Sequence, residues 1–307
     1  MIEMPASMAA KISSSLMPEP PCKTKGTELV DFNVSDLAGL KAIFEVSRAL
    51  NVPVIIGVSE GERDFIGVKQ IAALIKSLRD EYSARGAGGN YPIFLNADHM
   101  HSLEKIKEAV SAGFDAAVFD ASEFTFEENI KKTKEAVEYI KSVNPDFLIE
   151  GELGYIGSGS VLLKEIPIGA AVKPEDLTKP EEASRFVRET RVDLLAPAVG
   201  NIHGIVGGGN PKLDIERIKQ IKSTSSVPLV LHGGSGIKDE EILAAIDAGI
   251  SIIHINTELR LAWRQGVEKA LKENPEEITP YKLLPTAVEE IKKVVEQKLK
   301  LFNKINE

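Results

Sequence analysis

The chain has 307 residues, of which 43% are hydrophobic and 27% charged, a composition typical of a globular protein with a sizeable core. Its formal net charge of −9 argues against a nucleic-acid or anionic-membrane surface, because both require a basic footprint. The single cysteine, Cys22, excludes an internal disulfide, and with no secretory signal in the sequence we expect a cytoplasmic protein.

Two short segments flank the body of the chain. Residues 1–26 contain no sustained apolar run, and three prolines between residues 18 and 21 break any helix, so we expect an N-terminal arm. Residues 27–273 supply the roughly 250 residues that a single α/β barrel requires. Residues 274–307 are predicted to form a C-terminal helical extension.

Strands and helices alternate along the body of the chain. Apolar runs rich in β-branched residues predict strands at 29–34, 53–59, 93–99, 116–120, 147–153, 193–199, 227–231 and 251–256. Helical spacing predicts helices at 37–50, 64–82, 102–112, 127–142, 181–189, 214–222, 239–248 and 258–272. Eight strand-helix units with little polar alternation predict an α/β fold of the TIM (β/α)8 barrel type rather than an open sheet. One further amphipathic helix, 280–303, is expected outside the barrel.

The third predicted strand ends in a carboxylate beside an imidazole, Asp98 and His99, after the apolar run at 93–95. An aspartate at this place is often only the cap of the next helix. Ser102 is a better cap for that helix, so capping leaves the Asp-His pair unexplained. Chemistry or metal binding is the other interpretation of the pair.

Titratable side chains recur at the predicted strand ends, where TIM barrels carry their active sites. They are Asp98, His99, Asp120, Glu152, His203 and His232. A lone histidine near a strand is more often an ordinary core or surface residue, but three on one barrel face with a carboxylate favour a metal site. Imidazole ligands favour Zn²⁺, and three protein nitrogens leave one coordination position open for substrate.

Two glycine-rich stretches, 204–209 and 233–236, stand beside these histidines. Glycine lets backbone N–H groups approach an anion, and Ser235 precedes a predicted helix whose N-terminus favours phosphate. These features favour a phosphate site in the loops after strands seven and eight. The alternative is that the glycines only form tight turns.

Several motifs occur in the order of a known family. They are Asp31-Phe32-Asn33, VSEG at 58–61, Asp98-His99, AGFDAAVFDAS at 112–122, EGELGYIG at 150–157, VGNIHG at 199–204, VPLVLHGGSGI at 227–237 and NTELR at 256–260. On these motifs, the barrel from Leu29 to Trp263 resembles the class II, metal-dependent fructose-bisphosphate aldolases and their tagatose-bisphosphate relatives. Together the motifs are far more specific than any one of them.

The resemblance implies that His99, His203 and His232 hold a catalytic zinc. It implies an alternative or second divalent-metal position at Asp120 and Glu152, and leaves a monovalent cation open. Asp98 would be the general acid/base at the aldehyde-derived oxygen. The substrate contacts of the family match Asn33, Ser59, Gly204, Gly233, Gly234, Ser235, His254, Asn256, Thr257 and Arg260.

Within the substrate contacts, the glycine stretches with Ser235 and residues 254–257 would hold dihydroxyacetone phosphate, and Ser59 would lie nearer the aldehyde half. Arg260 matches an arginine that, in part of the family, reaches the substrate phosphate of a neighbouring subunit. The resemblance therefore also implies a homodimer or homotetramer.

The chain departs from the family pattern at four places. Residues 100–101, Met-His, replace a Gly-Ser type sequence, and residues 158–160 replace acidic loop residues, for which Glu165 is a candidate substitute. His254 replaces an asparagine that contacts substrate. Residues 279–281 replace an Asp-Pro-Arg that binds the distal phosphate in many members, so the departures concern the aldehyde partner most.

The sequence thus predicts a zinc-dependent aldolase that reversibly cleaves fructose 1,6-bisphosphate into dihydroxyacetone phosphate and glyceraldehyde 3-phosphate. One alternative is an aldolase for another ketose phosphate, such as tagatose 1,6-bisphosphate or a substrate that is not a bisphosphate. Another is a phosphate-binding homologue without turnover. In each case the expected partner is a small phosphorylated sugar, with no nucleic acid and no membrane.

Overall fold

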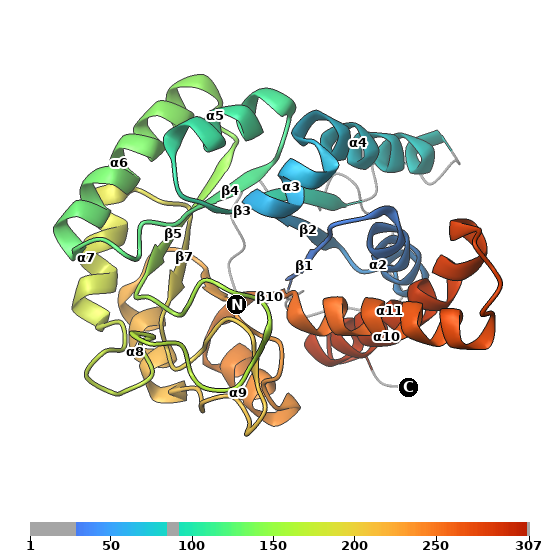
Figure 1. Cartoon of the computed structure of the whole chain (residues 1–307). Helices are drawn as coiled ribbons and strands as arrows, with labels where there is room; N and C mark the ends of the chain where they lie inside the picture. The colour runs from blue at the N-terminus through green and yellow to red at the C-terminus, as the bar shows by residue number, and fades with distance from the viewer. Residues whose placement is uncertain (1–28, 85–91, 306–307) are drawn as a thin grey trace.

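The protein is described by a computed structural model that covers residues 29–84 and 92–305, so the expected arm at 1–26 lies outside the described residues. Eight parallel strands close into a barrel (Figure 1), which confirms the predicted TIM-barrel fold. They are β1 (Leu29–Asn33), β2 (Val54–Ser59), β3 (Ile93–Met100), β4 (Ala116–Phe119), β5 (Leu148–Leu153), β7 (Leu194–Pro197), β9 (Leu229–Leu231) and β10 (Ile250–Ile255).

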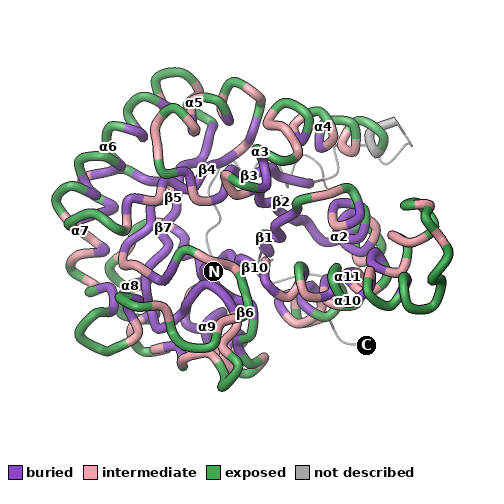
Figure 2. Tube along the Cα trace, in the orientation of Figure 1, coloured by how far each residue is buried: buried purple, intermediate pink, exposed green. Residues whose placement is uncertain are grey.

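Helices surround the barrel, with buried strands at the centre and exposed outer helix surfaces (Figure 2). The described helices are α2 (Leu37–Leu50), α3 (Glu60–Ile66), α4 (Val68–Ala84), α5 (Leu103–Ala112), α6 (Phe126–Val143), α7 (Pro180–Thr190), α8 (Ile215–Thr224), α9 (Asp239–Ala248), α10 (Thr257–Glu273) and α11 (Pro280–Phe302). Among them, none has the length and apolar character needed to cross a membrane. The predicted cap Ser102 does begin α5, because its side chain accepts the Lys105 N–H.

The structure differs from the sequence prediction in two places. The helix predicted at 64–82 is two helices, α3 and α4, which meet at Gly67 with φ of 97°, a conformation that favours glycine. Two loops that were predicted without regular structure contain short strands, β6 (Leu162–Leu163) and β8 (Ile205–Val206), which pair in parallel. A strand of two residues is too short to produce a periodic pattern.

Alternate residues of each barrel strand point inward and fill the barrel in layers. At the amino-terminal end this interior layer is apolar and consists of Leu29, Ile55, Phe94, Ala116, Leu148, Leu194, Val230 and Ile252, and Ala196, two residues after Leu194, packs against it. Two residues further along the same strands, the inward side chains are polar and buried: Asp31, Asn96, Glu150, His232 and His254. Gly57 belongs to this second layer, and a Cβ there would lie 2.3 Å from Asp31 Oδ1. Gly57 thus makes room for a buried carboxylate.

The C-terminal helix α11 lies outside the eight units and packs against α2 and α10. Gly266 of α10 allows the two helices to approach closely, because a Cβ there would lie 2.4 Å from the Ala287 Cα. Lys292 of α11 also lies 2.6 Å from a carboxylate oxygen of Glu45 in α2. The extra helix therefore braces the first and last units of the barrel.

Candidate active site

Three histidines from different barrel units meet at the carboxyl-terminal mouth. His99 lies in β3, His203 follows β7 and His232 follows β9. One ring nitrogen from each lies within 4.8 Å of the other two. The ring centroids are 4.6 Å apart for His99 and His203, 4.7 Å for His99 and His232, and 5.8 Å for His203 and His232. The fold thus brings the three predicted metal ligands into one cluster.

A β-bulge aims both Asp98 and His99 at this cluster. Neighbouring residues of a regular strand point to opposite faces. Here the pairing of β3 with β4 changes register between Ala97 and Met100, and His99 has φ of 52°. A bulge of this kind re-aims a side chain. The left-handed backbone of a non-glycine residue costs of order 1–3 kcal/mol, so surrounding contacts must hold it in place.

The ring nitrogens of His203 and His232 that point away from the cluster are held by oxygen atoms. His203 Nδ1 lies 2.5 Å from the Gly157 carbonyl oxygen, and His232 Nε2 lies 2.6 Å from Glu150 Oε1. These contacts leave His203 Nε2 and His232 Nδ1 as the nitrogens available to the cluster. His232 Nδ1 lies 3.0 Å from His99 Nε2.

The third histidine, His99, is oriented by the two carboxylates predicted for a second metal position. Its Nδ1 lies 3.1 Å from Asp120 Oδ2 and 3.2 Å from Glu152 Oε2. Burial disfavours the charged imidazole, but Asp98, Glu152 and Asp120 together raise the pKa of His99 well above its usual range. Burial raises the pKa of Glu152 to about 7. In this structure the carboxylates of Asp120 and Glu152 orient the His99 ring. Their role as a second metal position stays a prediction.

The donor set fits a divalent metal such as zinc. Burial lowers the pKa of His203 to about 4, and burial with the neighbouring His254 lowers that of His232 well below its usual range. Both rings are therefore neutral at physiological pH, which is the form that ligates metals. Oxygen contacts to the outer ring nitrogens of all three histidines match the support that metal-binding imidazoles usually have.

Asp98 lies directly beside the histidine cluster. Its side chain is buried, its Oδ2 accepts a hydrogen bond from Asn33 Nδ2 at 2.9 Å, and its Oδ1 lies 3.6 Å from His99 Nε2. Burial opposes ionisation, but His99 and His254 hold the pKa of Asp98 well below its usual range. An ionised carboxylate at this position can accept a proton from a bound substrate.

His254 stands between two buried carboxylates. Its Nδ1 lies 3.3 Å from Asp98 Oδ1 and its Nε2 lies 3.6 Å from Asp31 Oδ2. The ring stacks on His232 with centroids 4.0 Å apart. Burial disfavours its charge, but Asp31 and Asp98 raise the pKa of His254 to about 9. His254 and His99 therefore both face Asp98 Oδ1.

The predicted phosphate residues gather where the glycine loops meet α10. Ser235 Oγ accepts the backbone N–H groups of Asn256 and Glu258, each at 3.3 Å. The helix that follows Ser235, α9, begins at Asp239 as predicted, but the hydrogen bonds of Ser235 Oγ go to the other neighbouring helix. The helix N-terminus that reaches Ser235 is that of α10, whose first residue is Thr257.

The two glycine stretches are tied together and to the barrel. Asn210 Nδ2 donates to the carbonyl oxygens of Gly204 and Ser235, each at 3.0 Å. The N–H of Gly234, which follows Gly233, donates to the His254 carbonyl at 3.0 Å. These hydrogen bonds fit the interpretation that the glycines form turns, and phosphate binding by the same loops stays a prediction.

The sequence analysis did not identify Glu62, whose carboxylate lies beside the predicted substrate residues Asn33 and Ser59. The Glu62 side chain is 6% exposed and accepts hydrogen bonds from Asn33 Nδ2 at 2.9 Å and the Ser59 N–H at 2.8 Å. Arg260 donates to it at 2.7 Å. The arginine that was expected to reach a neighbouring subunit thus bonds within its own chain here, and contact with a neighbour stays a prediction.

Sequence reasoning also assigned no role to two buried carboxylates, Asp31 and Glu150. Burial raises the pKa of Glu150 to about 8 and that of Asp31 to about 6. Each stands two residues before a predicted site residue of the same strand, Asn33 and Glu152. The two-residue period of a strand places both on the inward face and was the signal that could have identified them.

Two other residues at which the sequence departs from the family pattern, His101 and Tyr281, are exposed to solvent. The side chain of His101 is 57% exposed, with Nδ1 3.3 Å from the Asp120 carbonyl oxygen. Tyr281 is 75% exposed at the start of α11.

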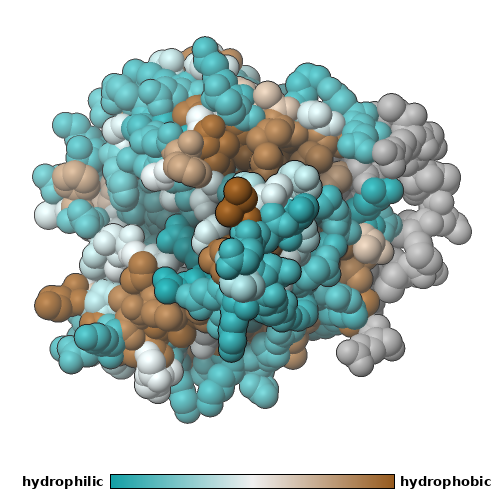
Figure 3. Space-filling view, turned by 45° about the vertical axis from the view of Figure 1, so that its right-hand side comes forward, coloured by the Kyte–Doolittle hydropathy of each residue, from teal (hydrophilic) through white to brown (hydrophobic). Residues whose placement is uncertain are grey.

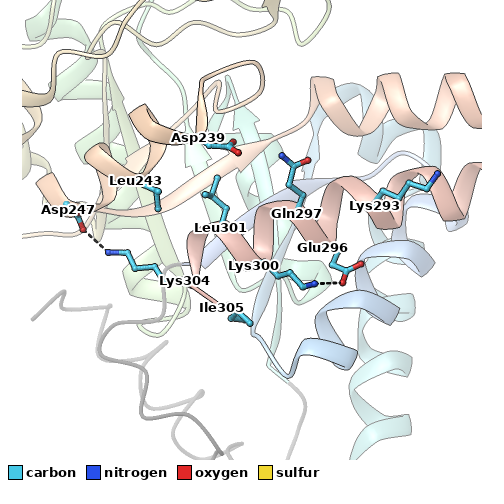
Figure 4. Close-up of a pocket in the computed structure, with 10 residues that line it drawn as sticks. All are labelled: Asp239, Leu243, Asp247, Lys293, Glu296, Gln297, Lys300, Leu301, Lys304 and Ile305. Atoms are coloured by element: carbon cyan, nitrogen blue, oxygen red, sulfur yellow. Dashed lines mark hydrogen bonds and ion pairs between the residues drawn. The ribbon is translucent and has the colours of Figure 1, made fainter. Parts of the chain in front are cut away.

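A separate hollow of about 810 Å³ lies between α9 and α11 (Figure 4), and its ten labelled residues include no predicted site residue. The Asp247–Lys304 ion pair of 2.8 Å spans that hollow.

Comparison with known proteins gives the family. The family model described as "Fructose-bisphosphate aldolase class-II" matches residues 20–307. The chain belongs to the class II fructose-bisphosphate aldolase family. This confirms the resemblance on which the site residues were named, and it supports lyase activity and the use of a divalent metal, which is typical of class II aldolases.

Relatives within and near this family cover almost the whole chain. The 6-phospho-5-dehydro-2-deoxy-D-gluconate aldolase of Shouchella clausii is 37% identical over 90% of this chain and 89% of its own length. The fructose-bisphosphate aldolase of Staphylococcus aureus is 35% identical over 92% and 94%. The crystal structure of the YdjI aldolase from Escherichia coli K12 matches with a TM-score of 0.71 and 29% identity over 96% and 94%. All three are named as aldolases, and the names of the first two give different substrates.

Proposed function

We propose that the protein is a zinc-dependent aldolase that reversibly cleaves a phosphorylated ketose into dihydroxyacetone phosphate and an aldehyde. The observation that carries this proposal is the convergence of His99, His203 and His232 beside the ionised Asp98. Ser235 and the N-terminus of α10 lie on the same barrel face. Metal ligands, an acid/base group and a phosphate cradle are the parts that such a reaction requires.

Each residue has a distinct task in the proposed reaction. A zinc ion held by His99, His203 and His232 would supply a Lewis acid that stabilises the negative charge developing on the ketose oxygens. Asp98 accepts the proton of the hydroxyl group that becomes the aldehyde and returns it in the synthetic direction. Ser235 and the first turn of α10 hold the phosphate of the dihydroxyacetone half.

The first candidate substrate is fructose 1,6-bisphosphate, which the sequence resemblance predicts and the name of the Staphylococcus aureus relative supports. The second is another ketose phosphate, including tagatose 1,6-bisphosphate and substrates with a single phosphate. The second is supported by the Shouchella clausii relative, whose named substrate carries one phosphate. His254 at a predicted substrate position also favours it.

A homodimer or homotetramer is part of the proposal. Large apolar side chains are exposed near the ends of several helices, namely Leu37, Phe65, Ile278 and Tyr281. Apolar residues gather in patches on an otherwise hydrophilic face (Figure 3). Contiguous apolar patches of this kind are common at protein interfaces. The molar mass of the purified protein in solution tests this part of the proposal.

The test of the proposed function is cleavage of fructose 1,6-bisphosphate and of fructose 1-phosphate after the metal has been stripped with a chelator and restored with Zn²⁺. We expect activity on at least one substrate to disappear and return. Cleavage that is insensitive to the chelator would contradict the metal-dependent mechanism. Tight binding of dihydroxyacetone phosphate without any turnover would instead support the binding homologue.

A further inference from the structure

Resting on the proposed aldolase function, we infer that the aldehyde half of the substrate carries no phosphate, so that the preferred substrate is a ketose 1-phosphate rather than a ketose 1,6-bisphosphate. The residue that sets this preference is Glu62. Its carboxylate accepts hydrogen bonds from the N–H of Ser59, which the family resemblance places nearer the aldehyde half, and from Asn33, which also donates to Asp98 at 2.9 Å.

Glu62 occupies a set of donors that would suit an anion. The Asn33 side chain and the Ser59 N–H donate to Oε2 at 2.9 and 2.8 Å. The Arg260 guanidinium and the Asn256 side chain donate to Oε1 at 2.7 and 3.4 Å. Four donors that converge on one point resemble the surroundings of a bound phosphate or carboxylate. In this protein the anion that these four donors surround is the carboxylate of Glu62, a residue of the chain itself.

The cavity next to Glu62 is unfavourable for a second phosphate. It has a volume of about 310 Å³, and its lining includes apolar residues such as Leu259 and Trp263. Among the described residues that line it, the charged side chains are Asp36, Glu62 and Arg260, so the lining has a net charge of −1. A phosphate monoester carries about −1.5 to −2 charges at neutral pH and would be repelled here.

The positively charged residue that lines this cavity, Arg260, already has hydrogen-bond partners within the protein. Arg260 donates from one terminal nitrogen to Glu62 and from the other to the Ser160 carbonyl oxygen at 2.9 Å. Glu62 is fixed at the N-terminus of α3, where it accepts the Ser59 N–H in the manner of a capping box. The helix dipole also favours a carboxylate at this position. Freeing Arg260 for a phosphate would therefore leave the buried Glu62 without its charged partner.

A hydroxylated, uncharged aldehyde meets none of these obstacles. Its hydroxyl groups carry no charge for Glu62 to repel and need no cationic partner, so Glu62 can keep its four donors, whereas a phosphate dianion offers only acceptor oxygens. Glu62 would thus discriminate by repulsion of the phosphorylated aldehyde, while the uncharged aldehyde is admitted. Glu62 is proposed to set specificity and takes no part in proton transfer.

The test compares fructose 1-phosphate with fructose 1,6-bisphosphate, two ketoses that differ only in the distal phosphate. For the zinc-loaded wild-type enzyme, we expect a higher kcat/KM for fructose 1-phosphate. In Glu62→Gln, the ratio should shift by roughly tenfold or more towards the bisphosphate, because the repulsive charge is gone and Arg260 is released. The change should appear mainly in KM for the bisphosphate.

The matched control is Asp64→Asn, which removes the same charge from the same helix. Asp64 faces Lys105 at 3.2 Å and does not line this cavity, so the substrate ratio should stay at the wild-type value. A wild-type preference for the bisphosphate would overturn the inference without any variant, and so would an unchanged ratio in Glu62→Gln. If neither substrate is cleaved and dihydroxyacetone phosphate exchanges no protons, the proposed function itself fails.

Discussion

The two ends of the barrel are built from the same strands and yet serve opposite purposes. At the amino-terminal end, side chains such as Leu29, Phe94 and Leu148 form an apolar layer that is almost fully buried. Two residues further along, Asp31 and Glu150 are equally buried but polar, and burial raises the pKa of both. Burying polar groups costs free energy unless they are paired, whereas apolar burial stabilises the fold. Within the barrel interior, apolar packing is therefore concentrated at one end and chemistry at the other.

The largest effect should come from a change at the chemical end. In His203→Ala, one of three metal-ligating nitrogens is lost, and we expect zinc affinity to fall and cleavage to drop by roughly a thousandfold. The thermal midpoint in the presence of chelator should stay near that of the wild type. His101→Ala is the matched control, because its side chain is 57% exposed and lies outside the cluster. Equal zinc content and activity in His203→Ala would refute the ligand assignment.

A second change at the chemical end separates proton transfer from metal binding. Asp98→Asn keeps the shape of the side chain and the hydrogen bond from Asn33 but removes the charge. We expect kcat to fall by roughly 10²–10⁴, with zinc bound at the wild-type stoichiometry. Zinc content and steady-state kinetics together check this. An undiminished kcat would remove Asp98 from the proposed role.

A change at the structural end should have the reverse signature. Phe94→Ala removes a large side chain from the apolar layer and should lower the free energy of unfolding by ~3–5 kcal/mol. The folded fraction should still bind zinc and turn over at the wild-type rate. Urea unfolding and zinc-normalised kcat provide the two readouts. Loss of kcat in fully folded Phe94→Ala would show that the two layers are not independent.

The smallest effect concerns a contact remote from both layers. Hydrogen bonds from Lys292 and Lys41 lower the pKa of Glu45. A lowered folded-state pKa stabilises the protein above the unfolded value of 4.5, and the contribution disappears as the pH falls through the lower folded value. Glu45→Gln should therefore lower the free energy of unfolding at neutral pH by less than ~1 kcal/mol. The thermal midpoint should fall only slightly. A gap between wild type and variant that persists in strong acid would contradict this.

The difference between the two ends also explains what the sequence could predict. Eight apolar runs with helical segments between them were enough for the barrel, because burial on both faces leaves a continuous apolar pattern. Barrel closure then brought strand ends together, and with them His99, His203 and His232. The two-residue period would have extended this prediction to Asp31 and Glu150.

Other parts of the site depend on geometry that no local pattern encodes. The bulge that turns His99 beside Asp98 arises from a register shift between two strands. Glu62 lies just before the helix predicted at 64–82 and carries no pattern of its own, and only the folded chain brings Arg260, almost two hundred residues later, to within 2.7 Å of it. Ser235 likewise meets α10 rather than the helix that follows it. Long-range contacts of this kind require the tertiary structure.

The most direct test of the central claim is proton exchange at the hydroxymethyl carbon of dihydroxyacetone phosphate in deuterated water, followed by NMR. The exchange does not depend on the aldehyde partner, so it tests the metal cluster and phosphate cradle alone. We predict stereospecific exchange with the zinc-loaded protein, its loss after chelation and its return with Zn²⁺. Stoichiometric zinc and bound dihydroxyacetone phosphate without exchange would contradict the assignment of this site as an aldolase centre.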